Sequence, residues 1–193
     1  MKYVVNLVIL ALIGLLAYAL IGGIQEPIKF KAEQSLRKNA VTTKLQQIRT
    51  AQELYREITG EFANTFDTLA YVLKTDSIPF IRLEADPEDP TNEDKYIRIV
   101  TYASAFDSIQ ALEIDLEDLA SVPFSENSQF EMKADTTTYQ STLVPVMECM
   151  TRYKEFMGPF ADPRYAQYDD TYDPDARIGF GSLSSPNLEG NWN

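Results

Sequence analysis

The hydrophobic and polar positions divide the chain into stretches of different character, and the first of these is almost entirely apolar. Val4 to Ile24 spans 21 residues without a charge, and its one strongly polar side chain is that of Asn6. A helix of this length crosses a hydrocarbon core of roughly 30 Å. We therefore predict a transmembrane anchor over residues 1–29, with lipid-facing positions that include Val4, Leu7, Leu10, Leu15, Leu20 and Ile24.

Two other interpretations of this stretch are weaker. A signal peptide has a shorter apolar run and a small-residue cleavage site, and Ile24 to Pro27 does not provide one. A buried core helix is uncommon at this length and position. Lysine and arginine are more frequent after the segment than before it, which mildly favours a cytoplasmic C-terminal domain. The side of the membrane stays open.

An amphipathic pattern follows over residues 30–60, beyond Pro27, where the helix either kinks or restarts. Its stripe has steps of four and three residues and is interrupted by Gln52 and Thr59. We predict a helical stalk that packs on its own domain near its end. Nearer its beginning it projects or packs on a neighbouring copy. The predicted interface positions are Val41, Leu45, Ile48 and Tyr55.

A corner between two helices is predicted next. Gly60 supplies the left-handed residue that commonly ends a helix, and Asn64 can cap a second helix with Asp67 three residues later. The buried face of that short helix is expected to consist of Phe66, Leu69, Ala70 and Leu73.

Patterns typical of strands dominate the remainder of the head domain, residues 61–157. A Pro-punctuated acidic loop at 84–95 separates the first two strands, and a helical turn is expected at 115–120. Pro145 fits an edge or the start of a strand. The predicted fold class is α+β, a helix-capped, mostly antiparallel sheet. The expected strands are Ile78–Leu83, Tyr96–Tyr102, Gln129–Lys133 and Val144–Tyr153.

The C-terminal segment, residues 158–193, mixes Pro, Gly, Asp and aromatic residues without a clear period. We predict an irregular segment. It contains too many aromatic residues for a linker, so we expect it to pack over the domain or over a neighbouring subunit. These aromatic residues are Phe160, Tyr165, Tyr168, Tyr172, Phe180 and Trp192.

Charge and composition limit the function. The chain of 193 residues carries 29 acidic and 17 basic residues, a net charge of -12, which argues against nucleic acid as a partner. It has no histidine, so histidine-dependent hydrolysis and histidine-ligated zinc are excluded and an enzyme becomes less expected. The single Cys149 cannot form an intrachain disulfide.

One acidic cluster could hold a cation. Asp169, Asp170, Asp173 and Asp175 offer enough oxygen ligands for calcium, but their spacing does not match the EF-hand pattern. We interpret the cluster as a solvated acidic turn, so no cofactor is predicted beyond this candidate calcium. No side chains are identified as catalytic or as binding a small-molecule substrate, although paired carboxylates for glycoside hydrolysis are compatible with the sequence.

The succession of apolar helix, amphipathic helix and α+β domain, together with IRTAQELYREITGEF at residues 48–62, resembles type IV pilins and type II secretion pseudopilins. The resemblance covers about residues 1–75. It implies an apolar helix that anchors the subunit and packs in a filament core. The first five residues lack the Gly of the prepilin leader and the later Glu. The whole chain also resembles uncharacterised single-pass proteins of Bacteroidota-type bacteria.

The sequence therefore predicts a non-enzymatic structural subunit of the bacterial inner membrane. It would oligomerise through its N-terminal helix in an envelope assembly or an extracellular pilin-like filament. The alternative is a single-pass accessory subunit of a secretion, motility or transport complex, and a membrane-tethered carboxylate hydrolase is a distant third. The expected partners are membrane lipid and either further copies or other envelope proteins.

Overall fold

The structure is a computed structural model that describes residues 1–85 and 96–192. Within these ranges the side chains at positions 17–19, 21–22, 83–85 and 96–97 lie outside the description. Most of the predicted acidic loop at 84–95 also falls outside the described residues.

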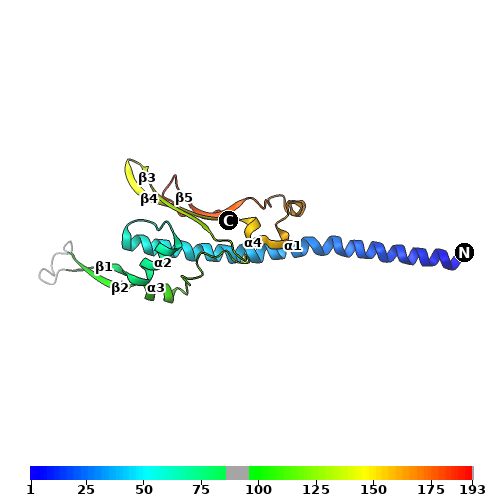
Figure 1. Ribbon diagram of the computed structural model, residues 1–193, viewed down its shortest axis with the longest axis horizontal. Coiled ribbons are helices and arrows are strands. Elements are labelled where there is room, and N and C mark those ends of the chain that lie inside the picture. Colours follow the sequence, from blue (N-terminus) through cyan, green and yellow to red (C-terminus); the bar gives the residue numbers. More distant parts are fainter. Residues whose placement is uncertain (86–95, 193) are drawn as a thin grey trace.

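One long helix, α1 (Lys2–Thr59), is the axis of the molecule. Its 58 residues correspond to a length of about 87 Å. The helix continues through Pro27, which excludes a restart there, while the alternative of a kink stays a prediction. In Figure 1 the N-terminal half extends away from the rest of the chain, and the other elements gather around the C-terminal half.

The predicted corner at Gly60 is confirmed. Gly60 adopts a left-handed conformation with φ of 83°, and its N–H donates to the Arg56 carbonyl at 2.8 Å. The next helix, α2 (Phe66–Thr75), is capped by Thr65, whose hydroxyl accepts from the N–H of Thr68 at 3.2 Å. The predicted cap at Asn64 is therefore corrected by one residue.

Asn64 has another role, because its side-chain oxygen accepts from the N–H of Ala134 at 3.0 Å. This hydrogen bond ties the corner to the strand β3 (Glu131–Tyr139). Gln52, which interrupts the apolar stripe, is fully buried and supports the same corner. Its amide donates to the Ala63 carbonyl at 3.0 Å and accepts from the Ala63 N–H at 2.9 Å. The polar interruption thus satisfies buried backbone groups.

The α+β class is confirmed, but the strands form two small antiparallel sheets instead of one. The first is a hairpin of β1 (Ser77–Ala85) and β2 (Tyr96–Ser104). The second has the order β3-β4-β5, with β4 (Thr142–Arg152) in the centre and β5 (Arg177–Ser182) at one side. Figure 1 shows the two sheets on opposite sides of the C-terminal half of α1.

Pro145 lies in the central strand, opposite Thr136 of β3. This position is compatible with a missing N–H because β5 pairs with β4 only from Met147 to Arg152. On the side that faces β5, Pro145 therefore lies outside the hydrogen-bonded ladder, as expected for a proline at an edge.

The structure contains several elements that the pattern did not predict. A helix, α3 (Ala105–Ala111), follows β2, and a short helix, α4 (Tyr153–Met157), follows β4. Residues 115–120, expected as a helical turn, form bends and turns. The C-terminal segment contributes β5 and two 3-10 turns, η1 (Gly158–Phe160) and η2 (Pro163–Gln167), so its predicted irregularity was wrong in part.

A single apolar core joins α1 to both sheets. Val41, Leu45, Ile48 and Ala51 of α1 are fully buried. They belong to the same cluster as Leu69 and Leu73 of α2, Ile109 of α3, Met147 and Cys149 of β4, and Ile178 and Phe180 of β5. The C-terminal half of α1 is therefore the central element of the head and not a separate stalk.

Candidate functional site: an exposed apolar helix and the contacts that hold it

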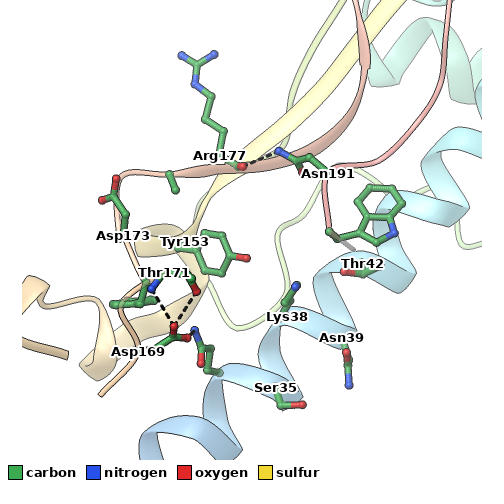
Figure 2. A pocket seen from close by; sticks show the side chains of 14 residues that line it. Ser35, Lys38, Asn39, Thr42, Tyr153, Asp169, Thr171, Asp173, Arg177 and Asn191 are labelled. Carbon is green, nitrogen blue, oxygen red and sulfur yellow. Dashed lines mark hydrogen bonds between the residues drawn. The ribbon is translucent and has the colours of Figure 1, made fainter. Parts of the chain in front are cut away.

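The acidic cluster of the C-terminal segment is dispersed among separate partners. Asp169 accepts from Gln34 at 3.0 Å and from the Thr171 hydroxyl and N–H at 2.7 and 3.0 Å (Figure 2). These hydrogen bonds, first from Thr171 and then from Gln34, lower the pKa of the Asp169 carboxyl. Asp173 accepts from the N–H of Asp175, whose own carboxylate pairs with Lys154 at 2.7 Å.

Asp170, the fourth member of this cluster, is exposed. Within the described ranges no group of three or more acidic, Cys or His side chains could hold a metal ion together. Calcium binding at Asp169, Asp170, Asp173 and Asp175 stays a prediction.

The predicted interface positions lie inside the subunit. Val41, Leu45 and Ile48 have no exposed surface, and Tyr55 is half-buried against the core. A side chain without exposed surface cannot contact a second copy, so the structure corrects the predicted role of the first three residues. Their stripe packs on the head of the same chain, as was expected only for the Tyr55 end.

The predicted anchor positions lie on the surface of the extended part of α1. The side chains of Leu7, Leu10 and Leu15 are 72%, 75% and 67% exposed. Val4, Leu20 and Ile24 are also exposed, and so are the other described large apolar residues of this stretch, which lie on all sides of the helix. We define the apolar rod as residues 3–24 of α1.

In the described part of the chain, no helix was found with the length and apolarity that a membrane crossing requires. Five positions of the apolar rod, 17–19 and 21–22, have side chains outside that part.

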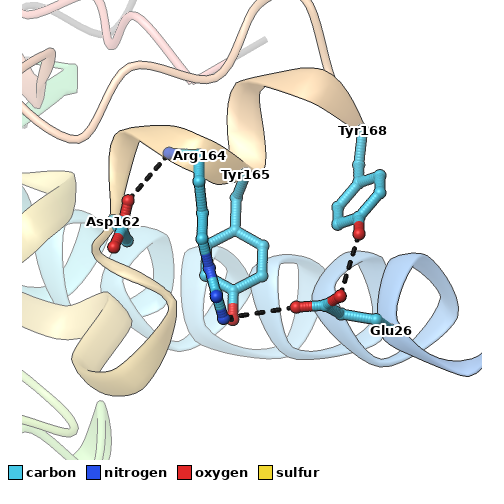
Figure 3. Close-up of polar contacts among 5 residues, drawn as sticks. All are labelled: Glu26, Asp162, Arg164, Tyr165 and Tyr168. Atoms are coloured by element: carbon cyan, nitrogen blue, oxygen red, sulfur yellow. Dashed lines mark hydrogen bonds and ion pairs between the residues drawn. The ribbon is translucent and has the colours of Figure 1, made fainter. Parts of the chain in front are cut away.

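A polar clamp holds α1 at the point where the apolar rod leaves the head. Glu26 accepts from Arg164 at 3.2 Å and from the Tyr168 hydroxyl at 2.9 Å (Figure 3). Arg164 also donates to the Tyr165 hydroxyl at 2.7 Å, and its guanidinium lies 4.7 Å from the centre of that ring. The hydrogen bond to Glu26 raises the pKa of the Tyr168 hydroxyl.

Phe30, one turn further along α1, is enclosed by aromatic rings of the C-terminal segment. It stacks on Tyr165 at a centroid distance of 4.9 Å and meets the edge of Tyr172 at 5.0 Å. Phe160 and Tyr168 lie 6.1 and 6.3 Å away. Phe30 is fully buried, and burial raises the pKa of Tyr172 to about 12. We define the aromatic clamp as these five rings.

Arg37 makes a further contact between α1 and the head. Its guanidinium donates to the Phe156 carbonyl at 2.7 Å, pairs with Glu33 at 2.8 Å and covers the Phe124 ring at 4.9 Å. Together with the Gln34–Asp169 hydrogen bond, these contacts fix α1 from Glu26 to Arg37 against the rest of the chain. The direction in which the apolar rod leaves the head follows from these contacts.

The sequence indicated the members of the aromatic clamp that belong to the C-terminal segment, because it predicted that this segment packs through its aromatic residues. It did not indicate Glu26, Phe30 or Arg164. Glu26 and Arg164 are separated by 138 positions, so no local spacing shows that they meet. Comparison with models of known protein families, with curated proteins and with solved structures finds no match to this chain.

Proposed function

We propose that this protein is a non-enzymatic structural subunit that is anchored in a bacterial inner membrane and assembles with further copies through the apolar rod. The product would be an envelope assembly or a pilin-like filament. The observation that supports this proposal is the exposure, on every side of the helix, of the described apolar side chains of residues 3–16, 20 and 24.

A helix that is hydrophobic all round is normally buried, in a protein core or in a membrane. Soluble monomers rarely expose a continuous apolar patch larger than a few hundred Å². The rod is attached to a head that already has its own core, so its apolar surface needs an environment outside the subunit. Lipid and the rods of neighbouring copies are the two environments with the required chemistry.

The rest of α1 is consistent with this proposal. Val41, Leu45 and Ile48 are buried within the subunit, so we assign the interface between copies to the rod and not to these residues. The polar and aromatic clamps keep the rod in a fixed direction relative to the head. A rigid connection is what a subunit needs if contacts between rods are to place its head regularly on the outside of an assembly.

The proposal is tested by placing charges on the rod of the full-length protein. We expect Leu10→Asp combined with Leu15→Asp to reduce both membrane association and chemical cross-linking between copies, because each charge at the centre of a bilayer costs about 2.5–3.5 kcal/mol. The measurements are the fraction that stays in membranes after alkaline extraction and the cross-linked species on a denaturing gel.

Leu143→Asp is the matched control, because Leu143 is 72% exposed in the head and Leu10 is 75% exposed in the rod. It should leave both measurements unchanged. Equal extraction and equal cross-linking of the rod variant and wild type would contradict the proposal. If the rod variant leaves the membrane fraction but is still cross-linked, the copies associate with one another without lipid.

An accessory subunit of a secretion, motility or transport complex is the second candidate, and a different surface favours it. Tyr71, Tyr102, Phe106 and Leu112 are all exposed large apolar residues of the lobe formed by α2, the β1–β2 hairpin and α3. Such residues are typical of protein interfaces. If Tyr102→Asp releases a co-purifying protein and leaves self-assembly intact, the lobe binds a different partner.

A further inference from the structure

A polar groove lies between α1 and the C-terminal segment, away from the apolar rod. Its cavity volume is about 570 Å³. One wall is the polar face of α1 from Gln34 to Thr42, and the other consists of residues 169–177 with Asn191 and Trp192 (Figure 2). The volume lies within the range of roughly 300–1,000 Å³ that is usual for small-ligand sites.

The acceptors along the groove are already engaged. Asp169 accepts three hydrogen bonds, from Gln34 and Thr171, and Asp173 accepts from the N–H of Asp175. The amide of Asn191 joins β5, where it accepts from the Gly179 N–H and donates to the Arg177 carbonyl, both at 2.9 Å. These hydrogen bonds hold the walls of the groove together.

Two of the donors along the groove, Lys38 and Tyr153, come from its opposite walls and have no hydrogen-bond partner in the part of the chain that the structure describes. Figure 2 shows the Lys38 side chain rising from α1 toward the space onto which the Tyr153 hydroxyl also opens, while Arg177 points away from α1. Both Lys38 and Tyr153 are half-buried. Among the described residues, neither the Lys38 ammonium nor the Tyr153 hydroxyl has a hydrogen-bond or ion-pair partner, whereas Lys44 pairs with Asp118 and Lys154 with Asp175.

Aromatic side chains complete the walls. Tyr172 is buried and Trp192 is half-buried beside the groove. The Trp192 ring packs against Gly190, where an added Cβ would approach the indole to 2.3 Å, so glycine is needed there to seat the ring. A ligand therefore meets a positive charge and a hydroxyl donor on one part of the groove and aromatic surface on another.

We propose that the groove binds the carboxylate of a small organic acid about the size of a dipeptide, with Lys38 and Tyr153 as the donors. A carboxylate accepts from an ammonium and a hydroxyl together, and such charge-assisted bonds are the stronger kind. A single negative charge fits better than the double charge of phosphate, because Asp169 and Asp173 border the groove and repel anions. Trp192 and Tyr172 contact the body of the ligand.

The chain provides its own reporter, because Trp192 is its one tryptophan. Full-length protein in mild detergent is titrated with N-acetyl-alanyl-alanine, and the Trp192 fluorescence is recorded. The dipeptide C-terminal amide, which has the same shape and no charge, is the matched ligand control. We expect a saturable fluorescence change with the acid and none with the amide at the same concentrations.

Lys38→Met should weaken binding of the acid about tenfold, as loss of a charge-assisted hydrogen bond predicts. Lys29→Met, an exposed lysine of the same helix outside the groove, changes the net charge equally and should bind as wild type does. Tyr153→Phe keeps the ring and removes the hydroxyl, so it tests the site even if Lys38→Met does not fold. A response that is absent, equal for acid and amide, or equal in all variants would overturn the proposal.

Discussion

The two halves of α1 belong to one continuous helix, yet their apolar side chains have opposite environments. Leu10 in the apolar rod is 75% exposed, and Leu45 in the packed half has no exposed surface. The two halves differ in how many polar residues are interspersed among their apolar residues. The packed half alternates charged and apolar positions, so one face can meet the head and the other can meet water. The rod has no polar face, so no packing on a single head can cover it.

This contrast also shows where along α1 the contacts with the head end. The head ends at Glu26 and Phe30, where residues from the far end of the chain close around α1. The boundary is therefore set by contacts of Arg164, Tyr165 and Tyr168, and it does not coincide with a break in the helix. Substitutions on either side of this boundary should have very different effects on the stability of the head.

Phe30 is expected to give the largest difference. Phe30→Ala removes the centre of the aromatic clamp and should lower the free energy of unfolding of the head by about 3–5 kcal/mol. Ile28→Ala, two residues away and 63% exposed, should change it by less than about 0.5 kcal/mol. Chemical denaturation followed by circular dichroism measures both. Similar losses for the two variants would mean that the clamp does not mark the boundary.

Gln52 sharpens the comparison inside the packed half, where one polar side chain is required. Gln52→Leu leaves the N–H and carbonyl of Ala63 without their partner and should cost about 2–3 kcal/mol, although leucine is the more apolar residue. Gln46→Leu, on an exposed position of the same helix, is the control and should be nearly neutral. Denaturation midpoints compare them. A stabilised Gln52→Leu variant would show that the corner does not depend on this amide.

Gly60 gives a smaller effect that depends on backbone conformation. Gly60→Ala forces an L-residue into φ of 83° and should destabilise the head by roughly 1–2 kcal/mol, even though no atom lies within 4 Å of the added Cβ. Gly23→Ala, in the rod, also has an open Cβ position but ordinary helical geometry, and should cause no loss. Thermal unfolding of both variants checks the difference. Equal melting temperatures would contradict the role of Gly60 as a helix stop.

Asp169 should show the smallest effect, and a pH dependence. Hydrogen bonds from Thr171 and Gln34 hold its pKa below the ordinary 3.8, so its contribution to stability is fully present above that pH. The contribution disappears as the pH falls through the lowered value. Asp169→Asn should therefore be slightly less stable than wild type at neutral pH and equal to it in acid. Denaturation at a series of pH values measures this, with Asp170→Asn as the exposed control. A stability gap that widens in acid would reverse the assignment.

Local patterns predicted the elements that local chemistry fixes. The helix end at Gly60, the α2 face of Leu69 and Leu73, and the strands near Ile78, Tyr96 and Val144 are present within a few residues of their expected positions. The elements that were missed are short or unusual in pattern. Helix α3 follows a strand without a break, and β5 is an Arg-Ile-Gly-Phe-Gly-Ser segment in which two glycines hide the strand signal.

Those two glycines are explained only by the neighbouring strand. A Cβ at Gly179 or Gly181 would come within 2.2 Å of a backbone carbonyl of β4, so close pairing of the strands excludes any side chain there. A glycine pair in a segment rich in turn residues looks irregular from the sequence. The constraint that selects them exists only once β4 is in place.

By itself, the sequence determined the apolar rod, the amphipathic helix after it, the α+β class and the absence of histidine, because composition and periodicity are local properties of the chain. The tertiary structure decided which surface of α1 is occupied. It buried Val41, Leu45 and Ile48 inside the subunit, closed Phe30 within a clamp of distant aromatic rings and left Lys38 and Tyr153 facing a groove. Each of these outcomes depends on segments more than a hundred residues apart meeting on one helix, and no spacing along the chain records such a meeting.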